Sequence, residues 1–172
     1  MPSEHSSDVK FEIGHVLFID IVGYSKLLMN NLVKITTFAK RYAKAWCSQN
    51  PDSVAAFYAE NGSLSVNDGP LAVGRAAIAR EAQAFMTTFP DMVVTMDKLV
   101  RDEEGTKFHW TLTGTNTGPG STGKRVRISG YELWKIDNDG LIAESQGYFD
   151  SAEYERQLKD GVEGQRRNAR AS

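Results

Sequence analysis

The 172-residue sequence has very little of several features that mark particular protein classes. Its single cysteine, Cys47, excludes an intramolecular disulfide and any metal site built from several cysteines. Its formal net charge is only -2, which gives no positive field to attract nucleic acid or an anionic membrane. We therefore expect neither nucleic acid nor a membrane among its partners.

The sequence also lacks an uninterrupted apolar run of the length that a membrane requires. Its most apolar N-terminal segment, residues 13–29, is interrupted by Asp20, Gly23, Ser25 and Lys26. A membrane-spanning helix needs about 20 mostly apolar residues. Glu4, His5 and Asp8 rather than a basic cluster precede the segment, and no Ala-x-Ala cleavage pattern follows it, so it is not typical of a signal peptide. The sequence predicts a cytoplasmic protein.

What is present favours one well-buried domain. Hydrophobic residues make up 41% of the chain and charged residues 24%, which is ordinary for a globular protein of this length. Apolar residues at three- and four-residue spacing, together with capping signals, predict three helices before residue 91. These helices span residues 35–46, start at Asn50-Pro51 and end at Asn61-Gly62, and run from Gly74 to Pro90.

Strand-like segments dominate the second half of the chain. After a short strand at residues 63–66, alternating and β-branched residues predict four more strands, and a last helix is expected from Ser151 to Lys159. Helices followed by antiparallel strands are typical of an α+β fold with the helices on one face of the sheet. A strongly twisted sheet of this kind curls around its helices into a cone. The four predicted strands are residues 92–100, 106–117, 124–136 and 141–149.

Several motifs give the chain a family resemblance. They are AWCSQNPDSVAAFYAENGSL, VGRAAI, WTLTGTNTG, TGKRVRISGYELWKI, DGLIAES and YFD, which lie between Ile35 and Leu158. Together they resemble the SnoaL-like polyketide cyclases of the nuclear transport factor 2-like superfamily. The resemblance implies a cone-shaped, cystatin-like fold with helices packed inside a strongly curved antiparallel sheet. It also implies an apolar pocket for a small apolar molecule, a homodimer through the exposed sheet face, and no cofactor or metal.

The resemblance also points to a candidate catalytic residue. SnoaL-type cyclases carry an acidic residue near the end of the last strand as the acid/base of an aldol condensation, and Asp150 holds the matching position. If Asp150 faces the pocket, strand alternation places Tyr148 and Gln146 on the same face. Tyr148 would then donate to an enolate oxygen as a second catalytic residue, and Gln146 would orient the substrate carbonyl.

A purely structural interpretation of Asp150 stands beside the catalytic one. The sequence Asp150-Ser151-Ala152-Glu153 fits a capping box, in which the aspartate caps the following helix and the glutamate occupies its third position. A cap ties the carboxylate to backbone N–H groups and lowers its pKa. Ser151 is an alternative cap that would release Asp150, so the two interpretations both stay open.

Three further residues are expected to contact the substrate. Trp110 and Trp134 lie in predicted strands, where they supply core or pocket wall. Glu132 lies between Tyr131 and Leu133 in a strand, so its carboxyl group is either a pocket group or the partner of an interface ion pair. No metal ligands are predicted.

The predicted function follows from the pocket. A carboxylate in a dry pocket supports proton transfer next to a carbonyl, so we expect cofactor-free acid/base chemistry on a small apolar carbonyl compound, by aldol cyclisation or isomerisation. The alternative is a dimer that binds a small molecule without catalysis.

The N-terminal segment HVLFIDIVGYSKLL resembles a different family. It is similar to the opening strand of class III nucleotidyl cyclases, and Asp20 matches their metal-binding aspartate. One strand cannot hold the catalytic metals, so the sequence predicts an inactive strand remnant at residues 15–24. The expected organisation is an N-terminal extension over residues 1–30, a SnoaL-like domain over 31–160 and a polar tail over 161–172.

Overall fold

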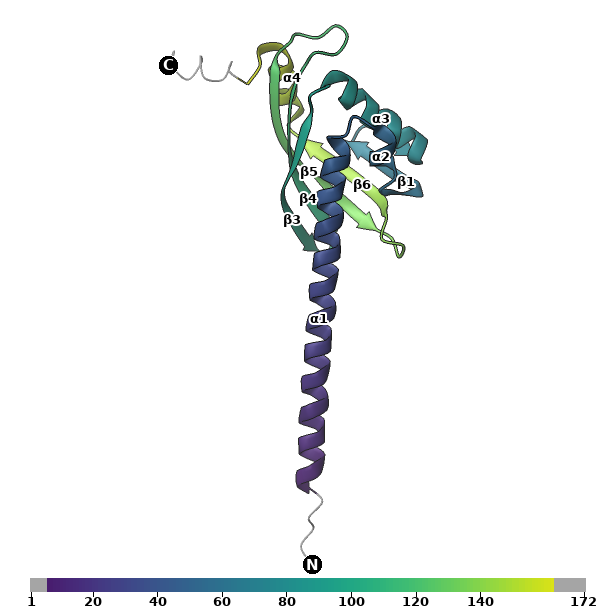
Figure 1. The fold of residues 1–172 in the computed structure, drawn as a ribbon, viewed down its shortest axis with the longest axis vertical. Helices are drawn as coiled ribbons and strands as arrows, with labels where there is room; N and C mark the ends of the chain where they lie inside the picture. Colours follow the sequence, from purple (N-terminus) through teal and green to yellow (C-terminus); the bar gives the residue numbers. More distant parts are fainter. Residues whose placement is uncertain (1–5, 163–172) are drawn as a thin grey trace, which may run out of the picture. The chain divides into compact units, whose positions relative to one another are not determined.

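The computed structural model describes residues 6–162, with side chains from Gly23 onwards. The chain divides into two compact units, Met1–Phe38 and Ala39–Ser172, which we call the first and second units. Helix α1, Ser6–Trp46, begins in the first unit and ends in the second (Figure 1). The division lies eight residues later than the boundary after residue 30 that the sequence suggested.

The described part of the first unit is helical throughout. Residues 15–24, which were predicted to form a cyclase-like strand, lie inside α1, so that prediction is wrong. β-branched residues favour strands only when a neighbouring strand pairs with them, and a helix satisfies its backbone hydrogen bonds locally. Several apolar side chains of the first unit are exposed, namely Tyr24, Leu27, Leu28, Met29, Leu32 and Val33.

The second unit is built on a six-stranded sheet with the order β2-β1-β6-β5-β4-β3. Figure 1 shows the sheet twisting strongly, with α2 and α3 beside its β1–β2 end and α4 near the far ends of β4 and β5. The pairs β1–β2, β3–β4, β4–β5 and β5–β6 are antiparallel, whereas β1 runs parallel to β6. The strands are β1 Tyr58–Val66, β2 Ala72–Val73, β3 Val93–Asp102, β4 Gly105–Thr115, β5 Arg125–Ile136 and β6 Ile142–Phe149.

The helices of the second unit begin where capping signals stand in the sequence. The Asn50 side chain accepts a hydrogen bond from the backbone N–H of Asp52 at the start of α2, Pro51–Ala55. Gly74 precedes α3, Arg75–Thr88, with a φ of 84°, a left-handed value that favours glycine. The last helix is α4, Ser151–Asp160, and residues 163–172 of the predicted polar tail lie outside the described residues.

The predicted α+β cone is confirmed, with two local corrections. Helix α2 ends at Ala55 instead of near Asn61, because Tyr58 already begins β1. Strand β2 was not predicted, and its two residues are too few to show a pattern. Among the described residues, no helix is both long and apolar enough to cross a membrane.

An aromatic cluster fills the core of the second unit. The ring of Tyr42, near the end of α1, lies 5.0 Å from that of Trp134 and 5.5 Å from that of Phe108. The rings of Phe108 and Trp134 stack at 4.8 Å. All three side chains are fully buried, so the end of α1 is held against the inner faces of β4 and β5. Buried aromatic pairs of this kind contribute about 0.5–1.5 kcal/mol each beyond the area they bury.

Candidate functional site

The register of β4, β5 and β6 decides which side chains share the inner face of the sheet. Glu132 on β5 lies opposite Phe108 on β4 and Gly147 on β6. Trp134 lies opposite Ser145, two residues further along the same face. Since side chains alternate along a strand, these residues all face the core. The inner face therefore carries a carboxyl group among aromatic rings.

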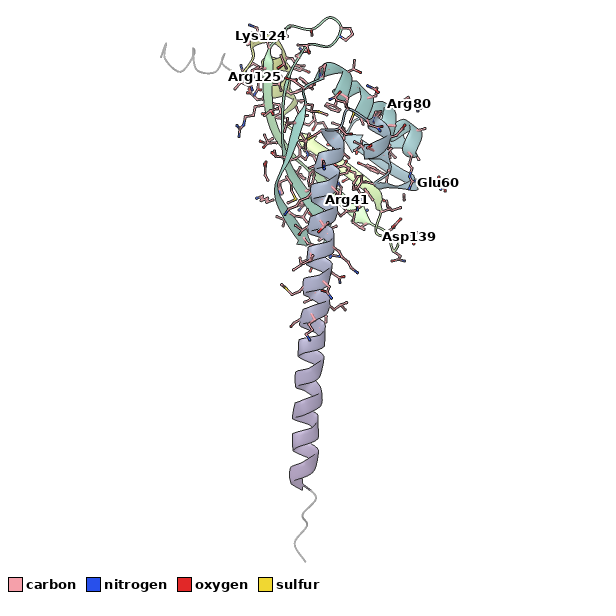
Figure 2. All side chains as sticks on the ribbon, in the orientation of Figure 1. Arg41, Glu60, Arg80, Lys124, Arg125 and Asp139 are labelled. Atoms are coloured by element: carbon pink, nitrogen blue, oxygen red, sulfur yellow. The ribbon has the colours of Figure 1, made fainter. Side chains whose placement is uncertain are left out.

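Glu132 is the one buried Asp, Glu, Lys or Arg among the residues whose side chains the structure describes. Its exposed fraction is 7%, whereas the charged side chains labelled in Figure 2 are all exposed. A buried carboxyl group is stable only if it is hydrogen-bonded or neutral. The surroundings of Glu132 supply hydrogen bonds and also favour its neutral form.

Three donors converge on one oxygen of Glu132. Oε2 accepts from the Tyr42 hydroxyl at 3.0 Å, from Trp134 Nε1 at 2.8 Å and from the Ser145 hydroxyl at 2.8 Å. The Tyr42 and Tyr58 hydroxyls are also hydrogen-bonded to each other at 2.9 Å, so the network continues into the core. None of the hydrogen bonds among the described residues reaches Oε1.

Burial is the main influence on the titration of this cluster. It raises the pKa of Glu132 above its ordinary value, and the hydrogen bonds from Trp134, Ser145 and Tyr42 oppose this rise without cancelling it. Burial and the nearby Glu132 charge also raise the pKa values of Tyr42 and Tyr58, so both hydroxyls stay protonated. The glutamate is therefore the group of this cluster with the lowest-lying titration, at a pKa above its ordinary value.

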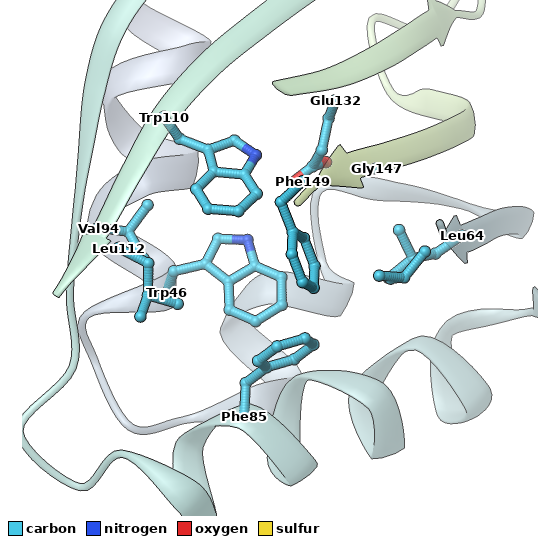
Figure 3. Close-up of a pocket in the computed structure, with 10 residues that line it drawn as sticks. Trp46, Leu64, Phe85, Val94, Trp110, Leu112, Glu132, Gly147 and Phe149 are labelled. Atoms are coloured by element: carbon cyan, nitrogen blue, oxygen red, sulfur yellow. The ribbon is translucent and has the colours of Figure 1, made fainter. Parts of the chain in front are cut away.

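Glu132 also lines a small apolar cavity of about 60 Å³ (Figure 3). Gly147, directly across the strand pair, has no side chain and leaves space beside the carboxyl group. Among the described residues that line the cavity, Glu132 is the only one with an ionisable side chain, which makes it the candidate chemical group of the site. The other lining residues are Trp46, Leu64, Val66, Phe85, Val94, Trp110, Leu112, Gly147 and Phe149.

Trp110 and Trp134, which the sequence analysis assigned the same role, have different roles in the structure. Trp110 lines the cavity beside Phe149, and its ring has room because residue 130 opposite it is glycine: a Cβ there would lie 2.8 Å from Trp110 Cζ2. Trp134 is fully buried outside the cavity lining and donates to Glu132. Trp134 thus positions the carboxyl group and does not line the cavity.

The inward arrangement of Asp150, Tyr148 and Gln146 is contradicted by the register. Tyr148 lies opposite Tyr131 and Gln146 opposite Leu133, so both are on the outer face. The Tyr148 hydroxyl donates to Asp68 Oδ1 at 3.1 Å, and the Gln146 side chain is exposed. Neither residue lines the cavity, because their partners Tyr131 and Leu133 flank the inward-facing Glu132 and point to the opposite face of the sheet.

Asp150 has the structural role that its capping box indicated. Its Oδ1 accepts a hydrogen bond from the backbone N–H of Glu153 at 3.0 Å at the start of α4, and the residue is exposed. This confirms the cap interpretation, and the geometry gives no support to Asp150 as the base of the cavity.

Replacing Asp150 by alanine is expected to lower the free energy of unfolding by about 1 kcal/mol, because α4 loses its N-cap. Asp150→Asn retains a good capping residue and is expected to stay close to the wild type. Urea unfolding of the three proteins measures the difference. An alanine variant as stable as the asparagine variant would show that the cap contributes nothing.

Sequence reasoning missed Tyr42, Tyr58 and Ser145 as partners of the carboxyl group. A usable signal did exist for Tyr42, which lies in the predicted helix over residues 35–46. A buried tyrosine hydroxyl needs a hydrogen-bond partner, and Glu132 was expected in a strand between Tyr131 and Leu133. The pairing itself depends on tertiary contacts between residues 90 positions apart.

The outer face of the sheet carries a row of aromatic rings. His109, Tyr131 and Tyr148 are cross-strand neighbours, with ring centroids 5.5 Å and 5.3 Å apart. The homodimer through this face and the cytoplasmic location stay predictions. Among the described residues, no group of three or more His, Cys, Asp or Glu side chains is placed to hold a metal ion.

Comparison with known proteins identifies both a family and a fold. Residues 36–158 match the sequence model of the SnoaL-like polyketide cyclases, whereas no curated protein gave a significant match. A protein with a ketosteroid isomerase-like fold from Catenulispora acidiphila DSM 44928, in complex with trimethylamine, is similar over 70% of this chain and 91% of its own, with a TM-score of 0.62 and 18% identity.

Two further solved structures share the fold. A phenazine biosynthesis-related protein from Pseudomonas aeruginosa is similar over 76% of this chain and 90% of its own, with a TM-score of 0.60 and 14% identity. An NTF2-like protein of unknown function from Burkholderia pseudomallei K96243 covers 72% of this chain and 95% of its own, with a TM-score of 0.61 and 17% identity. At these identities the likeness concerns the fold alone.

Proposed function

Because the chain belongs to the SnoaL-like polyketide cyclase family, we propose that its pocket performs cofactor-free acid/base chemistry on a small apolar carbonyl compound, with Glu132 as the acid/base. Aldol cyclisation and double-bond isomerisation both begin when a base removes a proton from the carbon next to a carbonyl. The observation that carries the proposal is the arrangement of Glu132: one oxygen is fixed by three donors, and the residue borders an apolar cavity.

The two oxygens of Glu132 have different tasks in this proposal. Oε2 is held by Tyr42, Trp134 and Ser145, which fixes the plane of the carboxyl group. Oε1 accepts none of these bonds and is the atom that takes and returns the proton. When Glu132 is neutral its proton resides on Oε1, because the three donors already occupy Oε2. The raised pKa makes Glu132 a stronger proton acceptor than an ordinary glutamate, which favours removal of the α proton.

The proposal is tested by deuterium exchange at the α carbons of cyclopentanone, followed by NMR in deuterated buffer. We expect wild-type protein to exchange faster than buffer alone, and the Asp150→Asn variant to match it. Loss of exchange in a folded Asp150→Asn variant would make Asp150 the base. No exchange above buffer by the wild type, under conditions where cyclopentanone binds, would contradict the catalytic proposal.

Non-catalytic binding of a small molecule is the second candidate. It is favoured by the hydrogen bonds that tie Glu132 to Tyr42 and Ser145, because such a network also stabilises the fold without any reaction. This candidate predicts that cyclopentanone binds and is recovered without deuterium.

A further inference from the structure

Two indole N–H groups of the cavity wall lack an acceptor within the described part of the chain. Nε1 of Trp46 and Nε1 of Trp110 are buried and form no hydrogen bond there. Figure 3 shows both nitrogens on the side of their rings that faces Phe149 and Glu132. The Trp46 N–H also helps to lower the pKa of Tyr42, but it does not form a hydrogen bond to the Tyr42 hydroxyl.

Buried N–H groups in native proteins almost always have a partner, and an unpaired one is destabilising. Trp134 illustrates the usual arrangement, since its indole N–H donates to Glu132 at 2.8 Å. Trp46 and Trp110 differ in bordering the cavity, where a bound molecule can supply the missing acceptor.

We infer that the indole N–H groups of Trp46 and Trp110 bind the acceptor oxygen of the ligand, and that the ligand is a compact, neutral carbonyl compound. The rest of the wall is apolar apart from Glu132, so these donors are the main polar recognition that the cavity offers. Pockets for drug-sized ligands have volumes of roughly 300–1,000 Å³. A cavity of about 60 Å³ therefore favours a molecule of few non-hydrogen atoms over a multi-ring polyketide.

The inference deepens the proposed function and, for the reactivity of the carbonyl, rests on it. When Glu132 Oε1 takes the α proton, the C–H electron pair becomes the C=C bond of an enolate and the carbonyl π pair moves onto oxygen. The indole hydrogen bonds to that oxygen strengthen as its negative charge grows, which lowers the barrier. The proton returns from Oε1 to carbon, so the step needs no further reactant.

A small ammonium ion is the competing ligand class. The aromatic rings of Trp46, Phe85, Trp110 and Phe149 border the cavity, and ring faces attract cations. The indole N–H dipoles, however, present their positive ends to the same space and disfavour a cation. The observations therefore favour a neutral oxygen acceptor.

The first test records indole N–H signals by NMR in protein labelled with 15N-tryptophan. Trp46→Phe and Trp110→Phe assign the three signals, and Trp134 is the internal control because its N–H is already bonded. We expect cyclopentanone to shift the Trp46 and Trp110 signals much more than methylenecyclopentane, which has the same shape without the oxygen. Equal shifts with the two molecules, or shifts of Trp134 alone, would overturn the inference.

The second test compares affinities in the same titrations. One neutral hydrogen bond corresponds to about a 2- to 10-fold change in dissociation constant. We expect Trp110→Phe and Trp46→Phe each to reduce the preference for ketone over alkene by that factor, whatever their effect on overall stability. Tighter binding of tetramethylammonium than of cyclopentanone would overturn the inference in favour of a cation site.

The two proposals fail in different ways. Ketone preference without deuterium exchange would leave the indole site standing and remove the catalytic role of Glu132. Exchange that depends on Glu132 but shows no indole shift would leave the catalysis standing and remove the indole site.

Discussion

Glu132→Gln is expected to lower the rate of α-proton exchange in cyclopentanone by about 100- to 10,000-fold, which is the usual contribution of a positioned general base. Glutamine has nearly the same shape as glutamate, and its amide oxygen can still accept from Tyr42, Trp134 and Ser145. It cannot take a proton near neutral pH. The variant therefore removes the proton acceptor while preserving the wall of the cavity.

The pH profile of the wild type provides an independent check on the same residue. Glu132 acts as a base only when ionised, and burial raises its pKa. The exchange rate is therefore expected to rise with pH through a midpoint above the ordinary range of a glutamate and to become constant at higher pH. The Glu132→Gln variant should lack this step. A step that persists in the variant would locate the base elsewhere, and an unchanged rate would end the assignment of Glu132.

The sequence predicted the elements of the second unit well because local patterns determine them. Capping residues stand before each short helix: Asn50 before α2, Gly74 before α3 and Asp150 before α4. Turn residues likewise separate the last four strands, which all lie close to their predicted ranges. Such signals act over a few residues, so a single sequence is sufficient to read them.

The site was harder to predict because it depends on which face of each strand turns inward. Alternation relates Asp150, Tyr148 and Gln146 to one another, but it does not say which set of residues is buried. The register with β5 decides this, placing Glu132 opposite the glycine at 147 and Tyr131 opposite Tyr148. The sequence resemblance had favoured Asp150, whereas the tertiary contacts put Glu132 in the cavity wall.

The N-terminal error has a related physical cause. Residues 15–24 have strand-forming side chains, and the sequence was interpreted from their type and from a short resemblance. Strand propensity reflects contacts with a neighbouring strand more than the backbone itself. The described part of the first unit contains no strand that could pair with this segment. Helix α1 therefore continues through it to the helical pattern around Tyr42.

Glu132→Ala is expected to lower the free energy of unfolding by about 3 kcal/mol. Removal of the carboxyl group leaves the Tyr42 hydroxyl, the Trp134 N–H and the Ser145 hydroxyl without this acceptor, and each unsatisfied buried donor is worth about 1–3 kcal/mol. Burial of the carboxylate is itself unfavourable, as its raised pKa indicates. Alanine removes this cost, which offsets part of the loss from the three unsatisfied donors. Urea unfolding near neutral pH measures the result.

Two variants control this measurement and connect it to the proposed chemistry. Glu144→Ala removes an exposed carboxylate that pairs with Lys135 at 2.8 Å, and exposed ion pairs contribute only about 0–1 kcal/mol. Glu132→Gln keeps an acceptor for the three donors and is expected to lose about 1 kcal/mol. If Glu132→Ala were no less stable than Glu144→Ala, the carboxyl group would not be holding these donors. The position of Oε1 would then be unconstrained, and a base needs a fixed proton-accepting atom within hydrogen-bond reach of its substrate.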